Sequence, residues 1–257
     1  MSADKRLFVL DEDLTTINIV ENPIFSSTKI LDITWSMPLG RFIVLSKTNA
    51  YVLDPITTRL SCIENIRLRD NEVEFVSSAY MDNTLFIAAS QSYHPFYIDS
   101  YHLPDFTFIR QYTMIDLIGK ELSSDSSGRI KTVKKPSDDE REVSIIRCVN
   151  GRLGLIVKIE YDEYYFCIVN LSRQPFSCFK TKLPSRDCTL IALVPSHEWI
   201  IVSGYSDSIV QFSLDCEFKT EYPAKREGLY DKATNVILLG SSRIIVLRGK
   251  NLEMYQR

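Results

Sequence analysis

The stretch VSIIRCVNGRLGLIVKIEYDEYYFCIVN, residues 143–170, decides how the rest of the chain is interpreted. It contains three runs rich in Val, Ile, Tyr and Phe, residues that favour strands, joined by two short turns. The first turn is Asn150-Gly151, a pair that favours a two-residue hairpin because both residues tolerate positive φ. Beyond the stretch, Gln174-Pro175 leads into an outer strand near Phe176 to Lys180. This segment therefore predicts four consecutive antiparallel strands.

The same succession of strands and turns returns along the chain at a nearly constant interval. The middle residues of the strands that follow the first turn of each unit are Val44, Ile87, Ile156, Val202 and Ile245. They are spaced by 43, 69, 46 and 43 residues. Three of these spacings lie at or next to the period of about 40 to 45 residues that marks a four-stranded propeller blade. The long interval exceeds 43 by 26 residues, which an insertion at residues 116–142 explains.

The two ends of the chain predict partial units. Leu7 to Asp11, followed by Thr15-Thr16, parallels Ala50 to Asp54 followed by Thr57-Thr58, so the chain begins with the third and fourth strands of a unit. Its end supplies the first three strands, which are Asn235 to Leu239, Arg243 to Arg248 and Leu252 to Gln256. If both ends share one blade, a ring of about five blades closes without exposed sheet edges. The predicted strands outnumber those of such a ring by one, so an incompletely closed ring or part of a larger propeller remains an alternative.

Two segments resemble the repeats of known propeller families. Val202 to Phe212, with the sequence VSGYSDSIVQF, is similar to the strand, turn and strand portion of a WD repeat. Asn49 to Arg59, with Asp54-Pro55 and Thr57-Thr58, resembles the equivalent hairpin of quinoprotein-like blades. The Gly-His and Trp-Asp dipeptides of WD repeats are missing, so the resemblance stays at the level of the fold. It implies an all-β propeller of four-stranded antiparallel blades. We predict a single domain over residues 1–257, with residues 116–142 as an inserted, disordered loop.

Composition and charge exclude several classes of protein. A chain of 257 residues that is 45% hydrophobic can bury a sizeable core, which argues against wholesale disorder. Thirty basic against thirty-three acidic residues give a net charge of -3, which does not favour binding to nucleic acid. No apolar run reaches the roughly 18 residues of a transmembrane helix, and the start of the chain does not resemble a signal peptide. We therefore expect a cytoplasmic, monomeric protein that binds neither nucleic acid nor membrane.

The spacing and surroundings of the cysteines indicate a protein of a reducing compartment. They form no C-x-x-C pair, and most lie in apolar segments that resemble strands. We interpret them as buried thiols rather than as disulfides or zinc ligands. The six are Cys62, Cys148, Cys167, Cys178, Cys188 and Cys216.

The sequence lacks the common catalytic and phosphate-binding motifs. The sequence contains no Gly-x-Gly-x-x-Gly, P-loop or Gly-x-Ser-x-Gly element. Its three histidines, His94, His102 and His197, are interpreted as turn or surface residues. Three aspartates in predicted turns have the oxygen ligands that calcium prefers, although turn formation explains them more simply. These are Asp82, Asp162 and Asp207. The sequence thus predicts no enzyme, no catalytic residue, no metal and no cofactor.

Four residues are candidates for contact with a partner. Trp35 and Trp199 flank the first turns of their units, where they either fill positions between blades or, if exposed, anchor an interface. Lys134 and Lys135 follow a serine cluster in the insertion, whose phosphorylation would add charge that basic groups can pair. The favoured hypothesis is a non-catalytic scaffold that binds proteins or peptides. The alternative is a calcium-dependent propeller hydrolase or lactonase, in which channel aspartates hold the metal.

Overall fold

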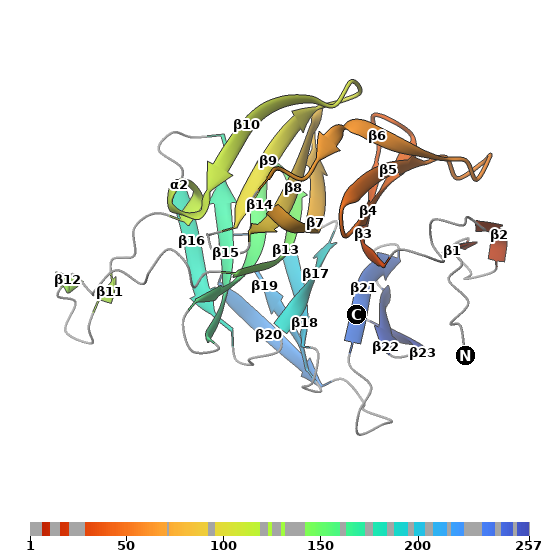
Figure 1. Cartoon of the computed structure of the whole chain (residues 1–257). Coiled ribbons are helices and arrows are strands. Elements are labelled where there is room, and N and C mark those ends of the chain that lie inside the picture. The colour runs from red at the N-terminus through yellow and green to blue at the C-terminus, as the bar shows by residue number, and fades with distance from the viewer. Residues whose placement is uncertain are drawn as a thin grey trace. The chain divides into compact units, whose positions relative to one another are not determined.

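A computed structural model describes the arrangement of most strands. The described residues are 7–10, 16–20, 29–70, 72–91, 96–118, 123–124, 130–131, 142–159, 163–172, 177–183, 188–194, 198–203, 208–214, 217–223, 233–239, 243–248 and 251–256. The chain divides into two compact units. Figure 1 labels most of their strands. Unit 1 comprises Met1–Ser92 and Tyr97–Gln111, and unit 2 comprises Tyr93–Phe96 and Tyr112–Arg257.

Unit 1 contains a hairpin and two four-stranded antiparallel sheets. The hairpin pairs β1 (Leu7–Leu10) with β2 (Thr16–Val20). The first sheet has the order β3 (Ile30–Ser36), β4 (Arg41–Ser46), β5 (Asn49–Leu53) and β6 (Leu60–Arg67). The second has β7 (Glu72–Met81), β8 (Thr84–Gln91), β9 (Tyr97–His102) and β10 (Thr107–Thr113) in the same succession, with β10 at the edge.

Unit 2 repeats this plan. Its first sheet consists of β13 (Glu142–Val149), β14 (Arg152–Ile159), β15 (Glu163–Asn170) and β16 (Ser177–Lys182). The next contains β17 (Cys188–Val194), β18 (Glu198–Ser203), β19 (Ser208–Phe212) and β20 (Phe218–Pro223). A three-stranded sheet follows, made of β21 (Ala233–Leu239), β22 (Arg243–Arg248) and β23 (Asn251–Gln256). In every sheet the strands are neighbours in chain order.

The strand registers confirm the repeat found in the sequence. The five residues that define the period all lie on the second strand of a sheet, β4, β8, β14, β18 or β22. Each has equivalent partners on both sides: Val44 pairs with Ile33 and Tyr51, and Ile156 pairs with Ile145 and Phe166. The interval found in the sequence therefore corresponds to successive sheets of the structure.

The turn chemistry also agrees with the prediction. Asn150 and Gly151, between β13 and β14, have φ values of 45° and 74°, the left-handed pair that a type I′ hairpin needs. A Cβ atom at Gly151 would lie 2.7 Å from Ser172 Oγ, so space as well as conformation favours glycine there. Gly40, with φ 58°, closes the turn between β3 and β4 by donating its N–H to Met37 O at 3.1 Å.

Apolar faces of successive sheets pack together inside each unit. In unit 1 one cluster lies between the two four-stranded sheets and contains Ile43, Leu45, Leu85 and Ile87, all at most 1% exposed. A second cluster joins Val20 of the β1–β2 hairpin to the opposite face of the first sheet. Unit 2 has its own cluster between the sheets β13–β16 and β17–β20.

Hydrogen bonds between polar groups connect β3 and β7, the first strands of the two sheets of unit 1. The Asp32 carboxylate on β3 accepts hydrogen bonds from Ser77 Oγ at 2.6 Å and from Ser78 N at 2.8 Å on β7. Thr34 Oγ1 adds a contact of 2.8 Å to Ser78 Oγ. Because both serines are buried, these bonds satisfy groups that water cannot reach.

The segment predicted as an insertion begins inside a short helix. Helix α2 (Met114–Ile118) buries Met114 and Leu117. Thr113 and Asp116 cap it reciprocally, Thr113 N donating to Asp116 Oδ2 and Asp116 N to Thr113 Oγ1. Farther along, β11 (Ser123–Ser124) pairs with β12 (Ile130–Lys131). The rest of residues 116–142, apart from Glu142 at the start of β13, lies outside the described residues, so the predicted disorder stays a prediction.

One prediction about the cysteines is wrong. Cys148 and Cys167 are buried thiols as expected, but Cys178 on β16 is only half-buried and Cys62 on β6 is exposed. The apolar run on which the prediction rested belongs to an outer strand, whose residues alternate only partly into the core. The side chains of Cys188 and Cys216 lie outside the described residues.

Candidate functional site

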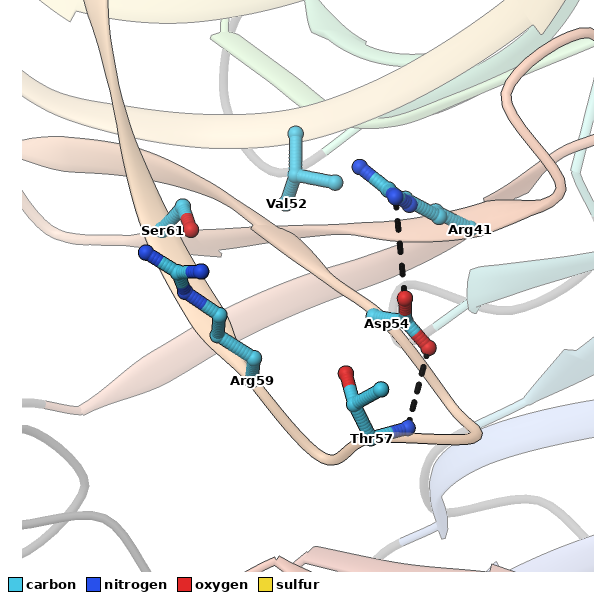
Figure 2. A pocket seen from close by; sticks show the side chains of 6 residues that line it. All are labelled: Arg41, Val52, Asp54, Thr57, Arg59 and Ser61. Carbon is cyan, nitrogen blue, oxygen red and sulfur yellow. Dashed lines mark hydrogen bonds and ion pairs between the residues drawn. The ribbon is translucent and has the colours of Figure 1, made fainter.

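The first sheet of unit 1 carries a pocket at one end. Because its strands alternate in direction, the β3–β4 turn and the β5–β6 turn lie at the same end of the sheet. A pocket of about 490 Å³ lies at this end, lined by the first residue of β4 and by residues of β5, β6 and the turn between them (Figure 2). Its lining residues are Arg41, Val52, Asp54, Thr57, Arg59 and Ser61, and we call it the turn-end pocket.

Asp54 fixes the shape of the β5–β6 turn. Its Oδ1 accepts hydrogen bonds from Ile56 N at 2.9 Å and Thr57 N at 3.1 Å, and its own N–H donates to Arg59 O at 3.0 Å. Thr58 completes the turn with a φ of 55°. An aspartate whose side chain bonds the backbone two and three residues ahead is typical of such turns.

The same carboxylate sets the electrostatics of the pocket. The hydrogen bonds from Thr57 N and Ile56 N, followed by the charge of Arg41, hold the pKa of Asp54 below its usual range. Arg41 Nη2 lies 3.6 Å from Asp54 Oδ2, in an ion pair whose arginine side chain is 52% exposed. An exposed pair of this kind adds little stability.

The pocket combines charge with an apolar wall. The guanidinium groups of Arg41 and Arg59 and the single carboxylate of Asp54 leave an excess of one positive charge (Figure 2). The Val52 side chain packs against the core cluster of unit 1 and presents an apolar surface to the pocket. Such a mixture of a few charged groups with apolar walls is usual for binding pockets.

Each of the two turns at this end of the sheet carries an exposed apolar side chain. Met37 in the β3–β4 turn is 72% exposed, and Ile56 in the β5–β6 turn is 88% exposed. These are the two most exposed large hydrophobic residues of the described chain. We call Met37, Ile56 and the turn-end pocket together the turn-end surface.

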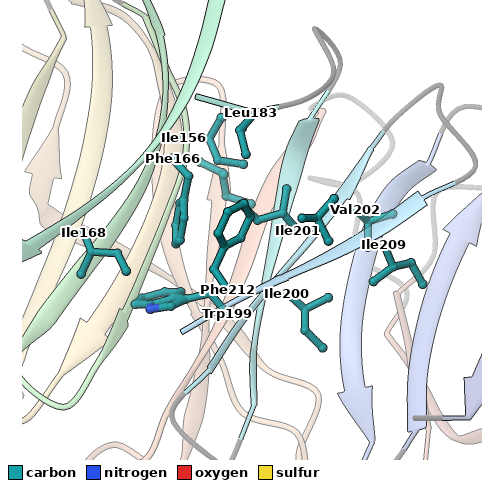
Figure 3. Packing of buried hydrophobic residues seen from close by; sticks show 12 residues of the cluster. Ile156, Phe166, Ile168, Leu183, Trp199, Ile200, Ile201, Val202, Ile209 and Phe212 are labelled. Carbon is teal, nitrogen blue, oxygen red and sulfur yellow. The ribbon is translucent and has the colours of Figure 1, made fainter. Parts of the chain in front are cut away.

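The two tryptophans predicted as interaction residues have different environments. Trp35 on β3 is 40% exposed and contacts Phe42 edge to face, with ring centroids 4.8 Å apart. Trp199 on β18 is fully buried between two sheets of unit 2, with its ring edge to face against Phe166 at 5.4 Å (Figure 3). Trp199 therefore fills a position between blades, the first of the two predicted alternatives, and is not accessible to a partner. Lys134 and Lys135 lie outside the described residues.

A second group of ionisable residues lies between the two sheets of unit 1. Arg69 Nη2 donates to Asp99 Oδ2 at 2.8 Å, and its guanidinium lies 5.0 Å from the ring centre of Phe108. Burial raises the pKa of Asp99, although the charge of Arg69 acts in the opposite direction. Tyr101 Oη donates to the same carboxylate at 3.3 Å, and burial raises the pKa of this tyrosine as well. We interpret this group as a structural link, because Arg69 joins the loop after β6 to strand β9.

Among the described residues, the histidines and aspartates considered for metal binding or catalysis do not lie together in one site. Asp82 lies in the β7–β8 turn with a φ of 53°, which agrees with a turn-forming role. His102 Nδ1 lies 3.1 Å from Asp105 Oδ1 in an exposed pair. His94, Asp162, His197 and Asp207 lie outside the described residues. Within the described ranges, no three His, Cys, Asp or Glu side chains are grouped so that they could hold a metal ion.

Similarity to known proteins is found in structure and not in sequence. No family model and no curated protein matches the chain. A protein of unknown function from Bacteroides caccae is similar over 95% of this chain and 79% of its own, with a TM-score of 0.61 and 12% identity. U3-55K is similar over 98% of this chain and 74% of its own, with a TM-score of 0.58 and 8% identity.

A third similar structure is YCF48 bound to a D1 peptide. The similarity covers 89% of this chain and 67% of that one, with a TM-score of 0.51 and 9% identity. Together with the four-stranded antiparallel sheets that recur in chain order, these likenesses decide the fold. The protein is a β-propeller. The sheets described above are its blades, and identities this low show the fold alone.

The arginines of the turn-end pocket were not singled out from the sequence, although the signal for them exists. Asp54-Pro55 and Thr57-Thr58 mark a hairpin between two strands of the blade. Once Phe42 is placed opposite Leu53, as the register shows, Arg41 must lie beside Asp54.

No described helix is long and apolar enough to cross a membrane.

Proposed function

We propose that this β-propeller is a non-catalytic scaffold that binds a protein or peptide partner through the turn-end surface. The observation that carries the proposal is the presence of two exposed apolar side chains, Met37 and Ile56, and a pocket of mixed charge at the same end of one sheet. Interfaces commonly combine apolar contact residues, Met and Arg among them, with a polar rim. The rigid blade beneath holds the two turns in a fixed relation.

The peptide complex of a similar structure supports the choice of partner. The YCF48 structure holds a D1 peptide, so a propeller of comparable extent binds a peptide. Propeller loops are the variable part of a repeated scaffold, and binding residues concentrate on such loops. A protein or peptide partner is therefore the favoured hypothesis for this chain.

The test is capture of a partner by matched variants. Purified protein is immobilised and incubated with cell extract, and the bound proteins are quantified against the amount of bait. A stoichiometric partner should be captured by the natural protein and lost on the double substitution Met37→Ser and Ile56→Ser. Ile109→Ser is the matched control, because Ile109 is 51% exposed but lies on β10 of the other blade.

Two results would contradict the proposal. One is a partner that the Met37 and Ile56 double variant retains at full stoichiometry. The other is calcium-dependent turnover of an ester or lactone, which would favour the alternative of a propeller hydrolase. Metal analysis of the purified protein and its melting temperature with and without calcium distinguish that alternative, because a bound ion stabilises the native state.

A further inference from the structure

We infer that the turn-end pocket binds an anionic side chain of the partner peptide, phosphoserine or phosphothreonine most tightly and glutamate or aspartate more weakly. This inference rests on the proposed function, since it names the chemistry that the turn-end surface recognises. It starts from the charges of the pocket. Two arginines, Arg41 and Arg59, and a single carboxylate, Asp54, line the pocket, and only Arg41 forms an ion pair with Asp54 in Figure 2.

The carboxylate is already engaged and does not neutralise both arginines. Asp54 Oδ1 accepts two backbone N–H groups, and Oδ2 lies 3.6 Å from Arg41 Nη2, which is longer than a hydrogen bond. Arg41 is therefore oriented by charge while its N–H donors can turn toward a ligand. Guanidinium groups present several donors in one plane and match carboxylate and phosphate oxygens.

The shape of the pocket favours a side chain over a free ion. A volume of about 490 Å³ lies within the range of small-molecule sites, about 300 to 1,000 Å³, and exceeds what an inorganic anion fills. Val52 offers an apolar surface for the Cβ of serine or the methyl group of threonine, and the Ser61 hydroxyl lies in the same wall. The exposed Ile56 stands beside the pocket, where it can contact the residues that flank the anionic one.

The number of positive groups favours phosphate over carboxylate. A phosphorylated side chain carries about -1.5 to -2 charges at pH 7 and three acceptor oxygens, enough to engage both arginines at once. A carboxylate has one charge and two oxygens. An RNA backbone offers the same phosphate chemistry, but the net charge of -3 disfavours a polyanion, which needs several neutralising contacts.

The experiment measures binding of capped amino acids to the intact protein. N-acetyl-phosphoserine methylamide and N-acetyl-glutamate methylamide are titrated while the arginine side-chain N–H signals are followed by NMR at constant ionic strength. Saturable shifts are expected at Arg41 and Arg59, with tighter binding of the phosphoserine probe. Substitution of either arginine by glutamine should weaken that binding about tenfold, the loss expected for one charge-assisted hydrogen bond.

The matched control is Arg110→Gln, which removes an exposed arginine from β10 and should leave binding unchanged. Because the second phosphate pKa is about 6, affinity for phosphoserine should also rise between pH 5 and pH 7. Far-UV circular dichroism of each variant verifies that it is folded. Equal weakening by all three arginine variants would show non-specific screening and overturn the inference.

The remaining outcomes separate this inference from the proposed function. If capped phosphoserine does not bind but a partner still depends on Met37 and Ile56, the pocket inference fails and the scaffold stands. If phosphoserine binds through both arginines but no partner depends on Met37 and Ile56, the proposed function fails. A single-stranded RNA oligonucleotide that binds through the same arginines, with steep salt dependence, would assign the pocket to nucleic acid and overturn the inference.

Discussion

The substitution Gly154→Ala tests how two blades of unit 2 pack together. Gly154 is a buried residue of β14, and a Cβ atom there would lie 2.4 Å from Trp199 Cζ3 and 2.6 Å from Trp199 Cη2. Carbon atoms in contact lie about 3.5 to 4.0 Å apart, so the methyl group would overlap the ring by more than 1 Å. The indole cannot withdraw easily, because Trp199 is fully buried and its ring lies against Phe166.

Two opposing effects determine how much Gly154→Ala changes the free energy of unfolding. Overpacking a well-filled core costs about 1 to 3 kcal/mol, and an overlap with a rigid ring belongs at the upper end of that range. Replacing glycine by alanine restricts the unfolded chain and returns about 0.4 to 1 kcal/mol where the native backbone accepts it. The φ of Gly154 is not positive, so that gain applies here. The expected net loss in the free energy of unfolding is about 2 kcal/mol.

Urea unfolding followed by far-UV circular dichroism measures this loss, and the control is the same substitution in a Trp199→Leu background. The smaller side chain removes the ring, so Gly154→Ala should there be neutral or stabilising. The coupling between the two positions should reach about 2 kcal/mol, well above the additivity error of about 0.5 kcal/mol for independent sites. An equal loss in both backgrounds, or a gain in the natural protein, would refute the described contact between Gly154 and Trp199.

Three further outcomes are expected. Asp32→Ala should lower the free energy of unfolding by about 2 kcal/mol in urea, because buried donors of Ser77 and Ser78 lose their acceptor, whereas Asp32→Asn keeps an acceptor oxygen and should cost less. Gly151→Ala should cost about 1 to 2 kcal/mol through its left-handed backbone, and a Ser172→Ala background should leave most of that loss in place. Burial raises the pKa of Asp99, so its carboxyl NMR signal should titrate above the ordinary aspartate value of about 3.9, and Arg69→Gln should raise the midpoint further. Since the Asp99 carboxyl binds its proton more tightly in the folded state, its contribution to stability is largest below the pKa of the unfolded state. That contribution is lost as the pH rises through the pKa of the folded state. A titration midpoint that Arg69→Gln leaves unchanged would contradict the ion pair between Arg69 and Asp99.

The strands and their order could be predicted because they depend on local patterns. Apolar runs with β-branched residues mark strands, and turn residues such as Asn150-Gly151 mark their ends. The interval between equivalent strands then shows the repeat, and the registers of Val44 and Ile156 bear it out. These features need no knowledge of which sheets lie together.

Residue environments could not be predicted to the same extent, because they depend on neighbours far along the chain. Trp35 precedes the first turn of its blade and Trp199 follows the first turn of another, yet the first is 40% exposed and the second fully buried. The difference depends on what packs against the ring: Gly154 leaves room for Trp199 on the facing blade, forty-five positions earlier in the sequence. The turn-end pocket needs the register of three strands, which the sequence suggests only after the hairpins are assigned.

The links between blades explain why the repeat is visible while its family motifs are missing. Adjacent blades are joined by an aspartate and two serines at the inner strands of unit 1, and by a tryptophan over a glycine in unit 2. A sheet requires an apolar face at a fixed period, but the contact between two sheets can be made by any pair of groups that fill the space and satisfy their hydrogen bonds. The period is thus retained along the chain, whereas the links seen among the described residues differ from one pair of blades to the next. Met37 and Ile56, on two turns at one end of the first blade, are mostly exposed, which is why we propose this end of the blade as the place of contact with another molecule.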